Sequence, residues 1–565
     1  MDYKTYISKK LDIPSVDKDE LTSLIVTPPD KDMGDYALPC FKLAKVLRKS
    51  PAMIADELKA GFKTDDVIVS CESVNGYLNF RVNRNALADE TLNVILSQND
   101  RYGSSDMGSG KTICIDYSSI NVAKPFHIGH LSTTVIGGSL YKIFKFLGYN
   151  AIGINHLGDY GTQFGKLIYA YKAWGNKEAV EKGGINELTA LYVRYHKESE
   201  KDPSLDDEAR RYFKLIEQGD KECNELFNWF KSLTIKEIEK IYEELDITFD
   251  SYAGESFYND KMQPVIDELE EKGLLKTSDG AKIVDLSEYD MPPCLILRSD
   301  GASLYATRDL AAACYRKEHY DFDKCLYVVA YQQNLHFRQI FKVLQLMGKE
   351  WAKDLVHVSY GMVSLLDENG NQVAMSTRNG TVVLLDDVLK KAHEKCLEII
   401  EEKNPNLEDK ENVARIVGTG AVIFGALSNS KIKDIAFSYD KILNFEGETG
   451  PYVQYTAARI KSVLRKGGEV GDYSGYELND DEYQLIAALS TFPDTVKSAA
   501  EKLEPFYITR YAIEVSSLYN KFYFDHKIIG AEEKAKNFRL ALSKATLITL
   551  TNALSLLGIK VPERM

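Results

Sequence analysis

The sequence predicts a multidomain α/β protein whose largest part is a parallel sheet with helices on its faces. The chain has 565 residues, several times the length of one typical domain, which suggests about three or four domains. A strand-like run, a polar loop and an amphipathic helix follow one another over residues 112–147, and this order opens nucleotide-binding α/β folds. From about residue 387 onward strand signals fade and helical periodicity dominates, which predicts a helical C-terminal part.

The composition is that of a globular protein and excludes several other classes. Apolar residues make up 44% and charged residues 27% of the chain, so sizeable cores can form and disorder is not indicated. The sequence lacks the run of about 18 apolar residues that crosses a bilayer, and residues 1–14 lack a signal peptide's apolar run, so we expect a cytoplasmic protein without a membrane partner. The net charge of −14 disfavours nucleic-acid binding over the whole surface but allows local basic patches.

The cysteines indicate neither a disulfide framework nor a metal site. They are scattered, with no CxxC pair and no neighbouring histidine cluster, which is atypical of structural zinc sites. We therefore expect reduced, mostly buried thiols and no metal ligands from the protein. The eight positions are Cys40, Cys71, Cys114, Cys223, Cys294, Cys314, Cys325 and Cys396.

Residues 1 to about 108 are expected to form a small α+β domain. A helical pattern spans residues 38–62, and strand-like residues follow at 67–83, where Gly76 indicates a turn or bulge. Residues 97–111 are rich in Gly, Ser and Asp, as linkers are.

Four further strand-like runs are expected to join the strand at 112–117 in one parallel sheet. Long helical segments separate these runs, which is typical of parallel sheets covered on both faces. A charged helical stretch from about residue 175 to 250 is interpreted as an insertion on that sheet. The four runs lie at 150–156, 294–299, 324–330 and 355–363.

The helix expected over residues 127–147 opens with the tetrapeptide HIGH and is ended by Gly148. Two imidazoles at positions i and i+3 beside a helix N-terminus can donate hydrogen bonds to phosphate oxygens, and the helix dipole favours the same negative charge. Gly129, between His127 and His130, lets an adenine lie against the backbone. A core or exposed histidine pair and a pair of metal ligands remain alternative interpretations of the tetrapeptide alone.

A second candidate for phosphate contact is the polar loop at residues 374–383. This loop contains glycine and is flanked by apolar runs. Such a loop can close over a triphosphate during a reaction, although an ordinary surface turn has the same composition.

Several of these segments together resemble the arginyl-tRNA synthetases, a family of class I aminoacyl-tRNA synthetases. The segment SSINVAKPFHIGH at 118–130 is followed by NHLGDYGTQFG at 155–165. HIGH is shared by all class I synthetases and by some nucleotidyltransferases, whereas the second segment is specific to the arginine enzymes. The similarity covers nearly the whole chain, and its further segments lie at 34–45, 76–82, 304–313, 328–339, 450–460, 519–528 and 561–565.

The resemblance implies a Rossmann-type class I catalytic domain with a small α+β N-terminal domain and an all-α C-terminal anticodon-binding domain. It implies an enzyme that activates L-arginine with ATP and transfers it to the 3′ end of tRNA(Arg), with Mg²⁺ as cofactor and a monomeric chain. The expected boundaries are 1–108 for the N-terminal tRNA-binding domain, 109–386 for the catalytic domain, 387–445 for a helical junction and 446–565 for the DALR-type domain.

The resemblance also assigns the groups that bind ATP and stabilise the transition state. Residues 374–378 align with the KMSKS loop of class I synthetases, but Ala374 and Thr377 stand where lysines are usual. Lys124, just before HIGH, is implied to compensate for the missing charge. The implied catalytic residues are His127, His130, Lys124, Ser376 and Arg378, and the implied ATP-binding residues are His127, Gly129, His130, Met375 and Ser376.

A pocket for arginine needs carboxylates, because the guanidinium is a planar fork of donors that pairs with two acceptors in parallel. The resemblance implies Asp116 and Asp309 for this role, and Tyr305 shares a helix face with Asp309. Without the resemblance, a salt bridge with Arg308 or a helix cap would explain Asp309 as well. The full implied set for arginine is Asp116, Ser119, Asn121, Tyr305, Asp309 and Gln333.

Two C-terminal segments have a composition suited to single-stranded RNA. Residues 459–466 carry four basic residues, and residues 519–527 interleave aromatics with lysines, so bases can stack while cations meet phosphates. An aromatic run in a helical bundle is also typical of a core. A nucleotidyltransferase and a non-catalytic RNA-binding paralogue remain the alternative functions.

Overall fold

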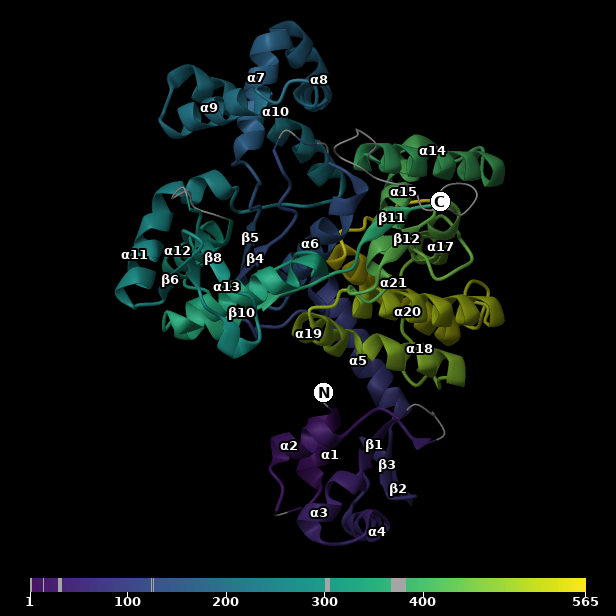
Figure 1. Cartoon of the computed structure of the whole chain (residues 1–565). Helices are drawn as coiled ribbons and strands as arrows, with labels where there is room; N and C mark the ends of the chain where they lie inside the picture. Colours follow the sequence, from purple (N-terminus) through teal and green to yellow (C-terminus); the bar gives the residue numbers. More distant parts are fainter. Residues whose placement is uncertain are drawn as a thin grey trace. The chain divides into compact units, whose positions relative to one another are not determined.

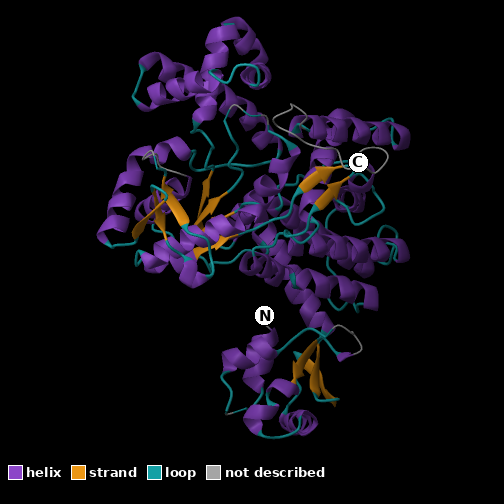
Figure 2. Cartoon of the chain, viewed as in Figure 1, coloured by secondary structure: helices purple, strands orange, loops and turns teal. Residues whose placement is uncertain are grey.

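The computed structural model describes residues 3–13, 15–28, 33–122, 124, 126–299, 305–366 and 383–565. The chain forms two compact units (Figures 1 and 2). The first unit comprises residues 1–99, 463–491 and 518–548, and the second comprises residues 100–462, 492–517 and 549–565. Within the described ranges, no helix is both long enough and apolar enough to span a bilayer.

The first unit contains a three-stranded antiparallel sheet in the order β1-β3-β2. Its strands are β1 (Tyr36–Pro39), β2 (Ile68–Val74) and β3 (Tyr77–Val82). The predicted turn at Gly76 is confirmed, because its φ is +81° and a Cβ there would lie 2.9 Å from the Cβ of Pro51. Glycine is therefore required both by the left-handed backbone and by the close approach.

The helix predicted over residues 38–62 is interrupted, so that prediction was wrong in part. Its first residues belong to β1, a short turn follows in α3 (Ala44–Leu47), and only α4 (Pro51–Gly61) is a full helix. Arg48 ends the short helix with a φ of +53°. Ser50 caps α4, since its hydroxyl accepts the Met53 amide at 3.3 Å. Hydrophobic periodicity does not register a break that a single left-handed residue makes.

Segments far apart in the sequence pack together in the first unit. The helices α1 (Tyr3–Lys10), α2 (Lys18–Leu24), α5 (Arg84–Gln98) and α18 (Asp480–Ser490) all belong to it. Arg84 on α5 and Asp480 on α18 form an ion pair of 2.7 Å. The fully buried Glu482 accepts a hydrogen bond of 2.7 Å from Nε of Arg539. Contacts of this kind make the unit discontinuous along the chain.

The second unit is built on a four-stranded parallel sheet in the order β10-β9-β4-β5 (Figure 2). The strands are β4 (Thr112–Asp116), β5 (Asn150–Ile154), β9 (Lys324–Tyr327) and β10 (Leu355–His357). Asp116 lies opposite Ile154 on one side and Tyr327 on the other. The predicted parallel sheet is thus confirmed for these strands, and their carboxyl ends meet at one edge.

One of the strand-like runs does not join that sheet as predicted, and another joins it only with its first residues. Residues 294–299 contain β8 (Cys294–Leu297), which belongs to an antiparallel sheet with β6 (Leu275–Ser278) and β7 (Ala281–Val284). The run at 355–363 ends after β10, and β11 (Val363–Leu365) pairs instead with β12 (Ile435–Phe437). Apolar runs of similar length occur in both kinds of sheet, so their composition does not identify the partner strand.

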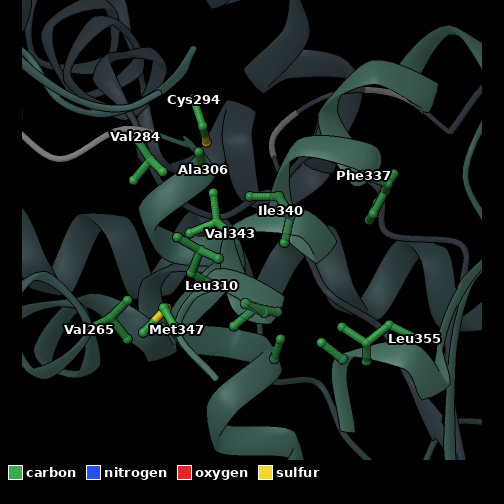
Figure 3. Packing of buried hydrophobic residues seen from close by; sticks show 14 of the residues in the cluster. Val265, Val284, Cys294, Ala306, Leu310, Phe337, Ile340, Val343, Met347 and Leu355 are labelled. Atoms are coloured by element: carbon green, nitrogen blue, oxygen red, sulfur yellow. The ribbon is translucent and has the colours of Figure 1, made fainter. Parts of the chain in front are cut away.

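The apolar core beside the parallel sheet fixes the helix that carries the predicted arginine-binding residues. Side chains from α11 (Met262–Glu271), α12 (Tyr305–Tyr320) and α13 (Asn334–Leu346) pack together (Figure 3). Leu310 and Val343 are completely buried there, and each such side chain contributes about 1.5 to 3 kcal/mol. The first turns of α12 and α13 are thereby held next to each other.

Helices make up most of the remaining described chain. The charged stretch predicted as an insertion forms α8 (Lys177–Ser199), α9 (Leu205–Glu217) and α10 (Lys221–Glu244), which pack on one another and on the preceding α7 (Thr162–Trp174) (Figure 1). Past residue 387 the predicted helical character is confirmed. The helices of this part include α14 (Leu385–Lys403), α15 (Lys410–Leu427), α17 (Gly450–Gly467), α19 (Phe492–Lys502), α20 (Phe506–Asp525) and α21 (Glu533–Leu556).

Candidate active site

The carboxyl edge of the parallel sheet carries Asp116, one of the predicted site residues. Asp116 is the last residue of β4, and Asn155 directly follows β5. The amide of Val328, directly after β9, donates to the carbonyl of Asp116 at 2.9 Å. This edge is where open α/β sheets bind their ligands.

The loop after β4 is held in an unusual backbone conformation. Ser118 and Ser119 have φ values of +68° and +45°, which cost energy for residues other than glycine. Buried hydrogen bonds compensate: the Ser118 amide donates to Oγ1 of Thr133 at 3.0 Å, and the Ser118 hydroxyl lies 2.8 Å from that of Tyr242. The chain is thereby turned so that Asn121 meets the segment after β5.

Asn121 lies against Gly158 of the segment NHLGDYG. The two residues form a parallel bridge, and the Val122 amide donates to the Gly158 carbonyl at 3.1 Å. A Cβ at position 158 would lie 2.4 Å from Oδ1 of Asn121. Glycine at 158 is required for this approach, which explains physically why the two predicted motif segments occur together.

The HIGH residues form a tight turn, not the first turn of an α-helix as predicted. His127 is the N-cap of a 3₁₀ turn at Ile128–His130, and α6 (Leu131–Phe146) starts after it. The Gly129 amide donates to Nδ1 of His127 at 3.1 Å, and the His127 amide donates to Nδ1 of His130 at 3.2 Å. Gly148 ends the helix as predicted, with a φ of +82°.

These two hydrogen bonds determine which nitrogen of each imidazole carries the proton. Burial, and then the charge of Lys124, lowers the pKa of His127. Burial, then His127 and Lys124, hold the pKa of His130 well below its ordinary value. Both rings are therefore neutral, and because Nδ1 accepts a backbone amide in each, Nε2 carries the hydrogen. The pair offers two N–H donors, and its ring centroids lie 3.9 Å apart.

The end of the polar loop reaches the HIGH turn. The Ile128 amide donates to the Val383 carbonyl at 3.0 Å, and the Leu385 amide donates to the Phe126 carbonyl at 2.9 Å. The described chain therefore resumes, at Val383, directly beside the HIGH backbone. The predicted loop residues Ala374, Met375, Ser376, Thr377 and Arg378 lie outside the described residues.

Asp309 occupies the centre of a group of polar side chains on α12 and α13. Its Oδ2 lies 2.6 Å from Nε2 of His336, and its Oδ1 lies 3.8 Å from Nε2 of His156. The Tyr305 ring lies 4.7 Å from that of His336, and the charge of Asp309 raises the pKa of Tyr305. A carboxylate has about four acceptor sites, so Asp309 retains acceptors for a ligand.

Arg308 does not pair with Asp309, which removes the alternative explanation of that aspartate. The guanidinium of Arg308 lies 4.3 Å from the ring centroid of Tyr160 and 3.5 Å from a carboxylate oxygen of Glu255. Asp309 also lies within α12 and not at its N-cap. Neither a salt bridge with Arg308 nor a helix cap therefore accounts for Asp309.

Asp116 is already paired with a guanidinium of the chain itself. Nη2 of Arg316, which is almost completely buried, donates to Oδ2 of Asp116 at 2.7 Å. The Ser119 hydroxyl donates to Oδ1 at 2.7 Å. A substrate guanidinium would have to share Asp116 with Arg316, which the sequence did not indicate.

Several residues of the pocket escaped the sequence prediction. Glu255 lies on the segment after the helical insertion, and burial, opposed by Arg308 and assisted by Asp309 and Asp159, raises its pKa to about 7. No spacing pattern marks Glu255, although it stands in a run of turn residues. His336 lies in the family segment at 328–339 but was not predicted as a site residue. Its position at the start of α13, close to Gln333, could have indicated a role in the pocket.

The arrangement suits activation of a cationic amino acid by a nucleotide. The site combines the neutral imidazole donors of the HIGH turn with the carboxylates of Asp116, Asp309 and Glu255. Among the described residues no group of three acidic, histidine or cysteine side chains could hold a metal ion. Fold and site together define a class I aminoacyl-tRNA synthetase.

Comparison with known proteins identifies the family within that class. Residues 91–439 match the family model of class I (R) tRNA synthetase catalytic domains, residues 453–565 match the DALR anticodon binding domain, and residues 1–82 match the arginyl tRNA synthetase N terminal domain. The chain belongs to the arginyl-tRNA synthetases, which are ATP-dependent arginine–tRNA ligases.

Similar whole proteins agree with this assignment. Arginine–tRNA ligases of Alkaliphilus metalliredigens and Clostridioides difficile are 54% and 53% identical, and each alignment covers 100% of both chains. The solved arginyl-tRNA synthetase of Thermus thermophilus superposes with a TM-score of 0.82 at 27% identity, covering 96% of each chain. The rival assignment to a small nucleotidyltransferase is thereby excluded.

Proposed function

We propose that the pocket around Asp309 binds the guanidinium of L-arginine. The observation that carries this proposal is the cluster of Asp309, Glu255 and Tyr305, in which the charges of Asp309 and Glu255 both act on Tyr305. A buried guanidinium needs a carboxylate to avoid a large desolvation penalty. Glu255 adds a second acceptor when ionised, and Asp116, held by Arg316, contributes further negative charge. Ser119, Asn121 and Gln333 are proposed to hold the α-amino and α-carboxylate groups.

The proposed first step is attack of the arginine carboxylate on the α-phosphorus of ATP. A carboxylate oxygen forms the new bond to phosphorus, and the bond to the bridging oxygen of pyrophosphate breaks. Negative charge grows on the phosphates during this step, so preorganised donors stabilise the transition state. The Nε2–H groups of His127 and His130 are proposed to supply two such donors, with Gly129 leaving room for the adenine. Lys124, Met375, Ser376 and Arg378 are proposed to complete the ATP site.

Mg²⁺ is proposed to enter with ATP and not to occupy a site of the protein. The described residues offer no group of three ligands for a metal, and Mg²⁺ commonly keeps several waters while it binds substrate phosphates. The ion would neutralise charge on the leaving pyrophosphate. Positioning of the substrates is left to the chain.

The second proposed step transfers arginine to the terminal adenosine of tRNA(Arg). A ribose hydroxyl attacks the carbonyl carbon of the adenylate, and AMP leaves with the bonding electrons. The DALR-type helices are proposed to bind the anticodon, and the first hundred residues are proposed to contact another part of the tRNA. Of the aromatic run in α20, Tyr519 and Phe522 are fully buried, whereas Phe524 is 88% exposed and is proposed to stack on a base.

We further propose that the enzyme acts as a monomer in the cytoplasm. The eight cysteines are all free thiols, which fits a reducing compartment. Light scattering of the purified chain tests the oligomeric state.

Arginine-dependent exchange between ATP and pyrophosphate tests the proposed chemistry. We expect exchange with arginine and tRNA(Arg) present, and none when lysine replaces arginine. A separate assay with tRNA omitted shows whether activation requires the bound RNA. Absence of exchange under every condition would refute the proposal and favour a non-catalytic role.

A further inference from the structure

A cavity of about 300 Å³ shares no residue with the site described above. The last turns of α10 form one wall and the middle of α15 forms another. The third wall is the segment from Gly558 to Lys560, near the C-terminus of the chain. The cavity therefore lies where the end of the chain returns to the catalytic helices within the second unit.

The walls of this cavity are held together by specific contacts. Gln454, which is fully buried on α17, donates from Nε2 to the Lys560 carbonyl at 2.8 Å and lies 3.2 Å from the Ile416 carbonyl. A Cβ at Gly420 would lie 2.6 Å from the same nitrogen. Nζ of Lys461 also donates to the Pro562 carbonyl at 3.2 Å. One side chain thus ties α15 to the C-terminal segment and preserves the shape of the hollow.

The cavity carries an excess of available positive charge. Lys240, Arg415 and Lys560 line it, and all three are exposed. Of its two acidic residues, Glu244 is already engaged, because its Oε1 lies 3.1 Å from both Nε2 of His393 and Oγ1 of Thr419. Lys240 is paired on its own helix with Glu237 at 2.9 Å, so Arg415 and Lys560 face Glu243 as the remaining carboxylate of the lining. Such a patch is distinctive on a chain whose net charge is −14.

We propose that this cavity binds a phosphate group, either from the backbone of the bound tRNA or from a free phosphate compound. Lysine and arginine are the usual phosphate ligands, through charge and through several N–H donors each. The tRNA source rests on the proposed function. The tRNA source is favoured because the cavity is lined by residues from the part that matches the catalytic domain and by residues from the part that matches the anticodon binding domain. A tRNA that binds both parts can place a backbone phosphate in this cavity.

The test compares two triple variants of the full chain. The cavity variant combines Lys240→Gln, Arg415→Gln and Lys560→Gln. The control combines Lys177→Gln, Lys201→Gln and Lys221→Gln, whose side chains are 72%, 71% and 91% exposed outside the cavity. Both variants change the net charge equally. The dissociation constant of tRNA is measured for each as a function of salt, and thermal melting checks that both remain folded.

We expect the cavity variant to bind tRNA about tenfold more weakly at low salt. The slope of log Kd against log salt should fall by about one, the change for one lost phosphate contact. The control should stay within about twofold of the parent in affinity, because scattered exposed lysines do not converge on one phosphate. Equal losses in both variants would overturn the proposal, since they would reflect general charge alone.

Glu243→Gln tests the sign of the ligand's charge. Removing this carboxylate should tighten tRNA binding about twofold if a phosphate lies beside it, whereas weaker binding would indicate a cationic ligand and overturn the proposal. If tRNA affinity is unchanged in the cavity variant, calorimetry with inorganic phosphate decides between the sources. If the parent protein shows heat of phosphate binding and the cavity variant does not, the ligand is a free phosphate. If the parent protein shows no such heat, the proposed site is rejected.

The test of the cavity can be separated from the test of the proposed arginine activation. Arginine-dependent pyrophosphate exchange at saturating tRNA should remain within about twofold of the parent in the cavity variant, because its three cations lie outside the arginine and ATP sites. An enzyme without exchange would refute the proposed reaction, whereas normal exchange with unchanged tRNA and phosphate binding would refute the cavity alone.

Discussion

Nε2 of His336 lies 2.6 Å from Oδ2 of Asp309 and thereby orients the carboxylate proposed to bind the substrate guanidinium. Hydrogen bonds to charged groups are worth about 1.5 to 3 kcal/mol. The two residues stand on different helices, α12 and α13, whose first turns are held by the same apolar core.

We expect Asp309→Asn to raise the KM for arginine at least 100-fold, because it removes the charge that opposes the guanidinium. His336→Ala should raise the same KM about tenfold and leave the KM for ATP unchanged. If His336 acts through Asp309, the double variant should be no worse than Asp309→Asn. The measurement is the rate of pyrophosphate exchange at varied arginine concentration. Additive effects of the two changes would show that His336 acts elsewhere, and His336→Gln should restore part of the loss.

The second prediction concerns pH and Glu255. Its pKa of about 7 means that the carboxyl is largely neutral at pH 6 and largely ionised at pH 8. A cation binds the ionised form more tightly, so the Kd for arginine should fall as pH rises over this range, by up to about tenfold per unit below the pKa. Arg308, Asp309 and Asp159 face the same carboxyl group.

Glu255→Gln serves as the matched control for this pH dependence. The variant should bind arginine with the weaker affinity of the low-pH parent, and that affinity should be flat between pH 6 and 8. Glu255→Asp should retain a pH-dependent affinity. A parent enzyme whose arginine affinity does not vary over the range would remove Glu255 from the pocket.

The third prediction concerns the buried ion pair of Arg316 and Asp116. Breaking a buried pair by removing one partner costs about 3 to 5 kcal/mol, because the remaining charge stays buried. Arg316→Met should therefore lower the free energy of unfolding by that amount in denaturant titrations. Arg316→Met combined with Asp116→Asn should recover part of the stability. Equal stability of the single and double variants would show that the pair is not coupled.

The fourth prediction concerns Lys124 and the substitutions in the polar loop. If Lys124 supplies the cation that Ala374 and Thr377 do not, Lys124→Ala should lower kcat for adenylate formation by about 10². The KM for arginine should change little, because the charge is needed in the transition state. When Ala374→Lys or Thr377→Lys is added to the Lys124→Ala variant, part of the lost rate should be recovered. An unchanged single-turnover rate of adenylate formation in Lys124→Ala would show that Lys124 does not compensate for the missing lysines.

The fifth prediction concerns the exposed aromatic ring of Phe524. Stacking of one base on an aromatic side chain is worth about 1 to 3 kcal/mol, so Phe524→Leu should weaken tRNA binding about tenfold. Phe524→Trp should preserve affinity, because it keeps a stacking surface. Arginine activation at saturating tRNA should not change in either variant. Equal affinities for all three side chains would exclude stacking at this position.

Local features of the fold could be predicted from the sequence because neighbouring residues determine them. The strand ending at Asp116, the turn at Gly76 and the end of a helix at Gly148 each depend on a few adjacent residues. The prediction of sheet membership failed where strands distant in sequence pair with each other. Residues 294–299 contain a strand as expected, but that strand pairs with the hairpin at 275–284 in a different sheet.

The sequence by itself determined the family, since short contiguous motifs carry it, and it predicted Asp116, His127, His130 and Asp309 as site residues. Tertiary structure alone decided how their charges act. Asp116 meets Arg316 across 200 positions and Asp309 meets His336 across 27, and folding brings Glu255 under the field of both Arg308 and Asp309. Protonation and pairing depend on burial and on distances of a few ångströms, and neither is encoded by spacing along the chain.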